Sequence, residues 1–175
     1  MKEIIINTPL NPSQLSRINI GDIIKINGTI LTARDATLFS MVKNDKKKKM
    51  NDLVLKNQII YFAGPAPGPG NKMISSCGPT TSSRMEPYIL FLLKQGVKVF
   101  IGKGPVSQTF LTLLRKNNAV YLLATGGAGV FLAKHIKQAE IIAFKELGPE
   151  AVYQLKVENF PTIACGIKGK SLIKI

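Results

Sequence analysis

The segment VKVFIGKGPVSQTFLTLLRKNNAVYLLA, residues 97–124, determines the fold class. Residues 97–101 are apolar except for Lys98, which is typical of a buried strand, and residues 119–124 show a similar apolar run. Between them, the pattern of residues 107–116 predicts a helix. A strand, a helix and a second strand in this order predict a βα unit on a parallel or mixed sheet. The sequence therefore indicates an α/β protein.

The residues that follow and precede this segment extend the alternation of helices and strands. Further helices are expected at residues 85–95, ended by Gly96, and at residues 130–138; further strands are expected at residues 141–144 and 162–167, with a last hairpin at residues 167–170. The C-terminal half is thus expected to consist of βα units on one sheet.

The N-terminal third is richer in strand patterns. Strands are expected at residues 3–7, 21–31 and 58–63, a hairpin turn at Asn27-Gly28, a helix from Asp35 onward, and a loop over the Pro- and Gly-rich residues 64–72. The fold class is therefore a β-rich N-terminal part followed by βα units.

Composition and charge narrow the class of protein. The chain has 175 residues, 45% of them apolar, and we expect residues 1–175 to form a single domain without internal repeats. With 24 Lys and Arg against 10 Asp and Glu, the net charge is +14, which indicates anionic partners. Lysine supplies most of this charge, and the lysine run at residues 46–49 is expected to be solvated surface.

We expect a cytoplasmic chain with no membrane partner. The N-terminus MKEIIINTPL lacks the layout of a secretory signal. The longest uncharged stretch, residues 117–133, is shorter than the ~20 apolar residues of a membrane helix. Cys77 and Cys165 are expected to be reduced thiols, and two cysteines are too few for the usual four-cysteine iron–sulfur or zinc site.

Nucleic-acid binding is one alternative that the net charge suggests. Contacts with phosphates would weaken steeply with salt. Trp is absent, and Phe and Tyr lie mostly in apolar runs, so the sequence does not indicate a platform on which single-stranded bases stack. A lysine-preferring genome explains the composition equally well, and we expect no specific nucleic-acid partner.

The scarcity of arginine makes two of the four arginines informative, because a planar guanidinium matches a carboxylate or phosphate with two hydrogen bonds. Arg34 lies in TARD, residues 32–35, where the β-rich part meets a helix. Arg84 lies in GPTTSSRM, residues 78–85, whose four hydroxyls are expected to cap a helix. Free N–H groups there favour anions, and hydroxyls can bind a ligand or relay a proton. A simple Ser/Thr cap with a surface arginine is the alternative.

Lys103 is the third candidate, at the C-terminal end of an expected strand where α/β sheets bind ligands. An ordinary solvated lysine in a turn is the alternative. The turn TGGAG, residues 125–129, lacks the spacing of a dinucleotide-binding loop and is expected to be a packing turn. His135, expected inside the following helix, has no ligand partner at metal-binding spacing. The residues alone therefore predict a site for a small polycarboxylate or another anion.

These segments, in this order, resemble the β subunit, or C-terminal domain, of the class I fumarase and L(+)-tartrate dehydratase family of iron–sulfur hydro-lyases. The resemblance runs from about residue 7 to the C-terminus, and TARD together with GPTTSSRM is its specific part. The matching segments are residues 21–22, 28–29, 32–35, 61–67, 78–82, 84–85, 102–104, 126–128, 146–148 and 157–161.

The resemblance implies a swivelling β/β/α domain and a dehydratase that converts (S)-malate to fumarate reversibly. A β subunit of L(+)-tartrate dehydratase, which converts tartrate to oxaloacetate, is the alternative. A [4Fe–4S] cluster is expected on an α subunit and not on this chain, which would be inactive alone. An α2β2 heterotetramer is the assembly that the resemblance suggests.

Residue roles follow from the resemblance by position. Arg34 and Arg84 would bind substrate carboxylates, and Lys103 would add a carboxylate or hydroxyl contact. Thr80, with Thr81 beside it, is the candidate base that removes the C3 proton.

The chain departs from the family pattern at several places, of which two affect the interpretation of the site. The family's TARD segment is often followed by Ala-Ala-His, whereas Asp35 is followed here by Ala36, Thr37 and Leu38. The missing histidine motivates a further alternative, a non-catalytic dicarboxylate-binding or regulatory module. Cys77 stands where a small residue is common, and is expected to be a core thiol or an oxidation-sensitive group near the site.

Overall fold

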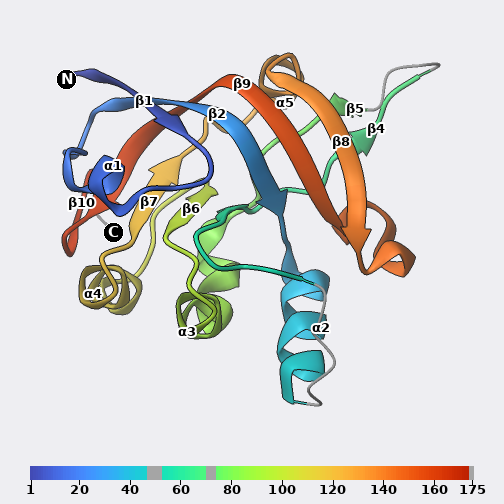
Figure 1. The fold of residues 1–175 in the computed structure, drawn as a ribbon, viewed down its shortest axis with the longest axis horizontal. Coiled ribbons are helices and arrows are strands. Elements are labelled where there is room, and N and C mark those ends of the chain that lie inside the picture. The colour runs from blue at the N-terminus through green and yellow to red at the C-terminus, as the bar shows by residue number, and fades with distance from the viewer. Residues whose placement is uncertain (47–52, 70–73, 174–175) are drawn as a thin grey trace.

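The computed structural model describes residues 1–46, 53–69 and 74–173 (Figure 1). The strands are β1 (Glu3–Asn7), β2 (Ile23–Thr32), β3 (Ile59–Tyr61), β4 (Ala66–Pro67), β5 (Ile74–Ser76), β6 (Val99–Gly102), β7 (Val120–Leu123), β8 (Ile136–Ala143), β9 (Val152–Ile167) and β10 (Lys170–Ser171). The helices are α1 (Pro12–Ser16), α2 (Asp35–Lys46), α3 (Glu86–Lys94), α4 (Gln108–Lys116) and α5 (Gly129–Ala133), with the 3-10 helices η1 (Ser82–Met85) and η2 (Lys145–Glu150). The side chains of the lysine run at residues 46–49 lie outside the described part.

A mixed sheet forms the framework of the molecule. Strands β1, β2, β3, β6 and β7 pair in parallel in that order. Strand β9 pairs antiparallel with β7 and also with β2, so the pairing closes on itself, and β8 pairs antiparallel with β9 (Figure 1). The predicted α/β class and the mixed sheet are confirmed.

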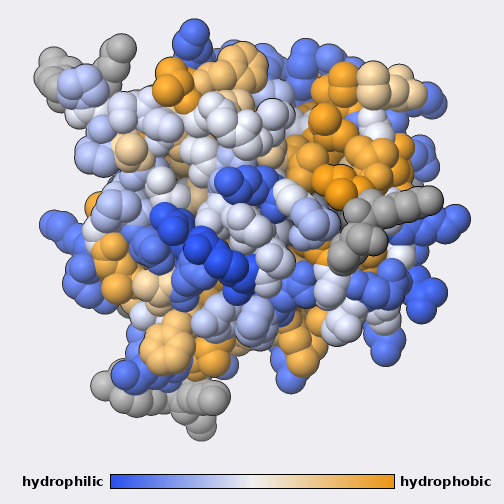
Figure 2. Space-filling view, turned by 180° about the vertical axis from the view of Figure 1, so that it is seen from behind, coloured by the Kyte–Doolittle hydropathy of each residue, from blue (hydrophilic) through white to orange (hydrophobic). Residues whose placement is uncertain are grey.

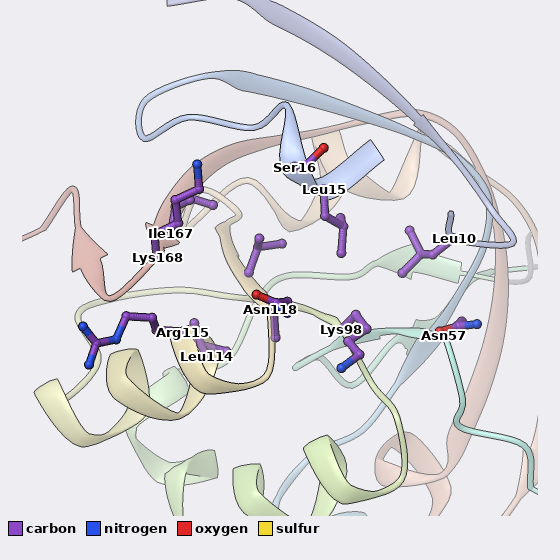
Figure 3. Close-up of a pocket in the computed structure, with 12 residues that line it drawn as sticks. Leu10, Leu15, Ser16, Asn57, Lys98, Leu114, Arg115, Asn118, Ile167 and Lys168 are labelled. Carbon is purple, nitrogen blue, oxygen red and sulfur yellow. The ribbon is translucent and has the colours of Figure 1, made fainter. Parts of the chain in front are cut away.

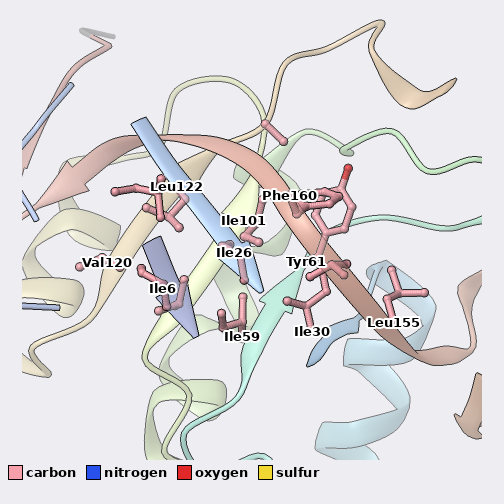
Figure 4. Packing of buried hydrophobic residues seen from close by; sticks show 14 of the residues in the cluster. Ile6, Ile26, Ile30, Ile59, Tyr61, Ile101, Val120, Leu122, Leu155 and Phe160 are labelled. Carbon is pink, nitrogen blue, oxygen red and sulfur yellow. The ribbon is translucent and has the colours of Figure 1, made fainter. Parts of the chain in front are cut away.

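Alternate side chains of the central strands divide the core in two. Ile59 and Tyr61 of β3 belong to a cluster with residues of β1, β2 and β9 (Figure 4). Ile60 of β3 and Phe100 of β6 point the other way, into a cluster with α2, α3 and α4 that includes Leu92. Because successive side chains of a strand face opposite sides, the β3, β6 and β7 layer lies between a second strand layer and the helices. This is the β/β/α arrangement that the resemblance implies.

The hairpin predicted at Asn27-Gly28 is wrong, because β2 runs through this pair without a turn. Both edges of β2 are occupied, by β1 and by β9, so the chain continues and adapts with a β-bulge at Gly28. Gly28 has a φ of +105°, which glycine tolerates well, and the Asn27 Oδ1 accepts a hydrogen bond from the Asn159 N–H at 2.7 Å.

The helix predicted for residues 130–138 is also wrong in its second half. Helix α5 ends at Ala133, and β8 begins at Ile136, so His135 lies between the two elements. Strand β8 forms because its backbone pairs with β9, and the local pattern of residues 130–138 does not show this pairing. The strand expected at residues 162–167 is likewise the last part of the much longer β9.

Part of the loop predicted for residues 64–72 forms β4, which pairs with β5. Residues 70–72 of that prediction lie outside the described part. The strand expected at residues 141–144 is the last part of β8, which begins at Ile136. The other predicted helices, strands and the last hairpin are confirmed within a few residues. Among the residues described, no helix is long and apolar enough to cross a membrane.

Candidate functional site

The predicted site residues lie at the carboxyl ends of the parallel strands. Arg34 follows β2, Gly64 follows β3, Lys103 follows β6, and the glycine-rich turn of residues 125–129 follows β7. A Cβ atom on Gly126 of that turn would lie 3.5 Å from Lys103 Cδ, so the Lys103 side chain lies against the turn. Because these strands run in parallel, their carboxyl ends bring together loops that are distant in sequence.

The hydroxyl-rich turn, residues 80–83, lies between the ends of β3 and β6. The Thr80 N–H donates to the Phe62 carbonyl at 2.7 Å, and the Lys103 N–H donates to the Thr80 carbonyl at 3.2 Å. The Ser82 N–H donates in turn to the Lys103 carbonyl at 3.0 Å. Backbone hydrogen bonds therefore hold Thr80 and Lys103 next to one another.

Arg84 connects this turn to the segment that follows β2. Its Nη2 donates to Thr80 Oγ1 at 2.5 Å and lies 3.2 Å from Asp35 Oδ2. Asp35 follows Arg34 directly in the chain, so this ion pair brings both predicted arginines to the same edge. The Arg84 and Asp35 side chains are 51% and 40% exposed, which leaves them accessible to a ligand.

Arg34 is held by Glu150, the last residue of η2. Arg34 Nη2 lies 3.4 Å from Glu150 Oε1, and the second oxygen, Oε2, accepts from the Ala36 N–H at 3.0 Å. Sequence reasoning missed Glu150, because it lies 114 residues from Ala36 in the chain and belongs to no recognisable motif. Only the fold places this carboxylate at the site.

The hydroxyl-rich turn does not cap a helix through its side chains, contrary to the prediction. Neither η1 nor α3 has a side-chain hydrogen bond at its N-cap. Ser82 instead shares a buried hydrogen bond of 2.9 Å with the Tyr121 hydroxyl, which donates to the Gly104 carbonyl at 3.0 Å. Burial raises the pKa of Tyr121, so its hydroxyl remains a donor. Thr81 is exposed, and its backbone forms a β-bridge with Lys103.

Three other residues considered from the sequence do not contribute side chains to this edge. Cys77 is fully buried and its pKa is raised by burial to about 12, which confirms the interpretation as a core thiol. Leu38 is buried in the core under the helices and offers no polar group. The Nδ1 of His135 shares a hydrogen bond of 3.0 Å with the Glu158 carbonyl, and its ring contacts Phe131 at 5.1 Å between centroids.

The donor set of the site suits carboxylates rather than a metal. Residues 1–46, 53–69 and 74–173 contain no group of three His, Cys, Asp or Glu side chains that could hold a metal ion. The thiols of Cys77 and Cys165 are both buried. These residues therefore do not fit as the ligands of an iron–sulfur cluster. The cationic side chains of Arg34, Arg84 and Lys103, by contrast, match anionic oxygen atoms.

A separate cavity of about 460 Å³ lies at the amino ends of β6 and β7 (Figure 3). Its walls include Leu10, Leu15 and Leu114, and hydrophobic surface gathers on the side of the molecule that carries α1 and β10 (Figure 2). The Lys98 ammonium donates to the Asn117 carbonyl at 2.8 Å, and the Arg115 guanidinium points away from the centre of the cavity. The lining of the cavity therefore differs from the candidate site, where the Arg84 guanidinium contacts both Thr80 and Asp35.

The fold and the site together define a β/β/α domain with cationic side chains at the carboxyl edge of its parallel strands. The sequence matches the family described as "Fumarase C-terminus" over residues 1–174, and the chain belongs to this family.

Curated relatives show the same relationship. The chain is 38% identical over 168 residues to fumarate hydratase 2 of Leishmania major and 34% identical over 163 residues to the aerobic class I fumarate hydratase of Escherichia coli K12. These matches cover 91% and 92% of this chain but 28% of each relative, so the chain spans less than a third of their length. It is also 35% identical, over 86% of its length, to a Methanocaldococcus jannaschii protein provisionally named L(+)-tartrate dehydratase subunit beta, of which 80% is covered.

Proposed function

We propose that this chain, a single domain, is the β subunit of a two-chain hydro-lyase that reversibly dehydrates (S)-malate to fumarate. The observation that carries the proposal is the convergence of Arg34, Arg84, Lys103 and Thr80 at the carboxyl edge of the sheet, in a chain of the fumarase C-terminal family. The Methanocaldococcus jannaschii relative, of which 80% is covered, is named as a subunit beta, and this name supports a partner chain.

The two arginines and the lysine bind the two carboxylates of the substrate in this proposal. A guanidinium forms two parallel hydrogen bonds with a carboxylate and fixes its plane, whereas an ammonium acts as a point charge. Arg34 and Arg84 therefore orient the substrate, and Lys103 stabilises the negative charge that develops on a carboxylate as the C3 proton leaves. In the described residues, Lys103 has no carboxylate within ion-pair distance, so its charge is available to the ligand.

Thr80 is the proposed base, and Thr81 is the second candidate. The Thr80 Oγ1 already accepts a hydrogen bond from the Arg84 guanidinium, and such a cation stabilises a hydroxyl oxygen that has lost its proton. Thr81 lacks a contact of this kind among the described residues. Its β-bridge with Lys103 instead supports a role in placing the lysine.

In this proposal the partner chain would hold a [4Fe–4S] cluster, which would supply Lewis-acid chemistry when bound. The residues of this chain bind the carboxylates and remove the C3 proton.

We propose an α2β2 assembly, because the family resemblance suggests it. Light scattering of the reconstituted complex should give a mass of two copies of each chain.

L(+)-tartrate dehydratase activity is the second candidate. The Methanocaldococcus jannaschii relative, most of whose length is covered, carries that name. Tartrate differs from malate by one hydroxyl, and the same cationic groups suit both dicarboxylates. The groups that recognise the extra hydroxyl then belong either to the partner chain or to the carboxyl edge of the sheet in this chain.

The proposal is tested by anaerobic co-expression of this chain with a candidate α subunit from the same genome, the chain expected to hold the cluster. After reconstitution of the cluster, (S)-malate and L(+)-tartrate are assayed in parallel. Turnover that requires both chains is expected, and the preferred substrate identifies the enzyme. A stable, cluster-loaded complex without turnover of either substrate contradicts the proposal and favours a non-catalytic module.

Two arginine variants make this test specific to the site. Arg84→Ala is expected to reduce kcat/KM by at least a hundredfold, because one side chain contacts both the candidate base and the substrate. Arg115→Ala removes an exposed arginine near the opposite end of the sheet and should leave turnover unchanged. Equal activity in the two variants would show that the site is assigned wrongly.

A further inference from the structure

We propose that Glu150 is a positioning residue that orients Arg34 for the substrate carboxylate. This inference rests on the proposed function, and it adds a residue that the sequence motifs do not contain. Glu150 does not itself bind the substrate; it acts through the Arg34 guanidinium.

The contacts of Glu150 connect two segments that are far apart in the chain. Its Oε1 lies 3.4 Å from Arg34 Nη2, and its Oε2 accepts from the Ala36 N–H at 3.0 Å. Its backbone carbonyl accepts a hydrogen bond from the Thr37 hydroxyl. Glu150 therefore binds both the guanidinium and the first turn of α2, where backbone N–H groups lack partners inside the helix. The position of Arg34 is thus coupled to the helix that begins beside it.

Close packing restricts Arg34 further. A Cβ atom on Gly64 would lie 2.8 Å from the Pro149 carbonyl, 3.0 Å from Arg34 Nη1 and 3.1 Å from Arg34 Cδ. Gly64 and η2 therefore enclose the arginine side chain, which is 27% exposed. The buried Arg34 Nε has no hydrogen-bond partner among the described residues. Glu150 thus engages one nitrogen of the guanidinium and leaves donors for a ligand.

Only a carboxylate can make both contacts of Glu150. Two separate donors, from Arg34 and from the backbone of Ala36, approach its two oxygens. A glutamine has one oxygen and one NH2 group, so it can accept from only one of these donors while its own N–H groups face the other. Because the Ala36 N–H is fixed by the helix backbone, the Gln side chain is expected to keep that contact and displace Arg34.

The first experiment measures Glu150→Gln in the reconstituted two-chain complex. We expect KM for the preferred substrate to rise about tenfold while kcat changes by less than about threefold. The reason is that the variant disturbs the orientation of one contact with a substrate carboxylate. Binding of succinate, measured by calorimetry on the same complex, should weaken in parallel. An unchanged KM would overturn the inference. A lower KM would also overturn it, because Glu150 would then compete with the substrate for Arg34.

A double-mutant cycle distinguishes action through Arg34 from an independent effect. In an Arg34→Ala background, Glu150→Gln should have no further effect on KM, because the group that it positions is absent. If the two effects on KM multiply instead, Glu150 does not act through Arg34 and the inference is wrong.

Two controls separate positioning from stability. Thr37→Val removes the other contact between α2 and Glu150 and keeps the carboxylate, so the complex should melt at a lower temperature with an unchanged KM. Glu158→Gln makes the same chemical change in an exposed ion pair with Lys137 and should alter neither quantity. A rise in KM in Thr37→Val equal to that in Glu150→Gln would indicate a purely structural role and overturn the inference.

The outcomes also separate this inference from the proposed function. If the wild-type complex turns over neither substrate and does not bind succinate, both fail together. If the wild-type complex is active and Glu150→Gln behaves like it, the proposed function holds and the positioning role alone is rejected.

Discussion

Arg84 contacts both a hydroxyl and a carboxylate through a single nitrogen. Its Nη2 donates to Thr80 Oγ1 and pairs with Asp35 Oδ2. The other donors of the guanidinium then remain for a ligand, and their planar arrangement is what distinguishes arginine from lysine at this position. The identity of the side chain should therefore matter as much as its charge.

We predict that Arg84→Lys keeps the charge but loses most of the function. The ammonium cannot contact Thr80, Asp35 and a substrate carboxylate with the same fixed geometry, so kcat/KM should fall at least tenfold. Steady-state kinetics on the reconstituted complex provide the measurement, with Arg115→Lys as the matched control. Activity equal to that of the control would show that charge alone is required at Arg84.

Cys77 provides a prediction about alkaline pH. Its pKa is 9.0 ordinarily and is raised by burial to about 12, so between these values the unfolded chain releases a proton that the folded chain keeps. The free energy of unfolding should therefore fall as the pH rises above 9 toward 12, with the full contribution present below 9. Burial raises the pKa of Tyr61 as well, so this residue should also lower the free energy of unfolding as the pH rises, in a higher pH range.

Two measurements check this prediction. Denaturant unfolding at increasing pH should show a smaller decline for Cys77→Ala than for the wild-type chain. Iodoacetamide at mildly alkaline pH should leave Cys77 unmodified in the folded protein and modify it after unfolding, as peptide mapping would show. Rapid modification of Cys77 in the folded protein would contradict the assignment as a buried thiol.

Strand β2 depends on a glycine where the chain bends rather than turns. Gly28 has a φ of +105°. It also lies close to Thr8, the residue that follows β1, because a Cβ atom on Gly28 would lie 2.1 Å from Thr8 Oγ1. The bulge therefore requires both a positive φ and an absent side chain. Gly21 has a similar φ of +85° but nothing within 4 Å of its Cβ position.

We predict that Gly28→Ala destabilises the chain by about 2–4 kcal/mol, because backbone strain and overpacking both act there. Gly21→Ala should cost only about 1 kcal/mol, from the backbone alone. Urea unfolding of the two variants compares these free energies. Equal losses in the two variants would show that the contact with Thr8 contributes nothing and that the bulge is set by φ only.

Helix α5 and strand β8 show how pairing overrides local pattern. Residues 130–138 read as one helix, yet the helix ends at Ala133 and residues from Ile136 pair with β9. The strands of the βα units, in contrast, were predictable because their apolar runs are bounded by glycine turns and helical segments. Elements whose stability depends on distant pairing were the ones that sequence alone misassigned.

The charge of the whole molecule, +14, does not by itself define a nucleic-acid-binding protein. The cations at the candidate site are partly neutralised by Asp35 and Glu150, which lie within ion-pair distance of Arg84 and Arg34. That arrangement suits a small anion with defined geometry better than a long polyanion.

We therefore predict no binding of the chain to a short DNA duplex at about 150 mM salt, where non-specific phosphate contacts are weak. Fluorescence anisotropy with a labelled duplex, titrated at low and then at physiological salt, provides the measurement. Tight binding that persists at the higher salt would favour a nucleic-acid function over the proposed one.

The sequence by itself determined the α/β class, the β-rich first part and three cationic residues worth testing, Arg34, Arg84 and Lys103. These follow from local patterns: apolar runs, glycine turns, and arginines that are scarce in a lysine-rich chain. Only the tertiary structure decided that the sheet closes through β2 and β9, that β2 bulges at Gly28, and that Glu150 holds Arg34. The physical reason is that strand pairing and ion pairs between distant segments depend on the folded path of the chain, which no local window of sequence contains.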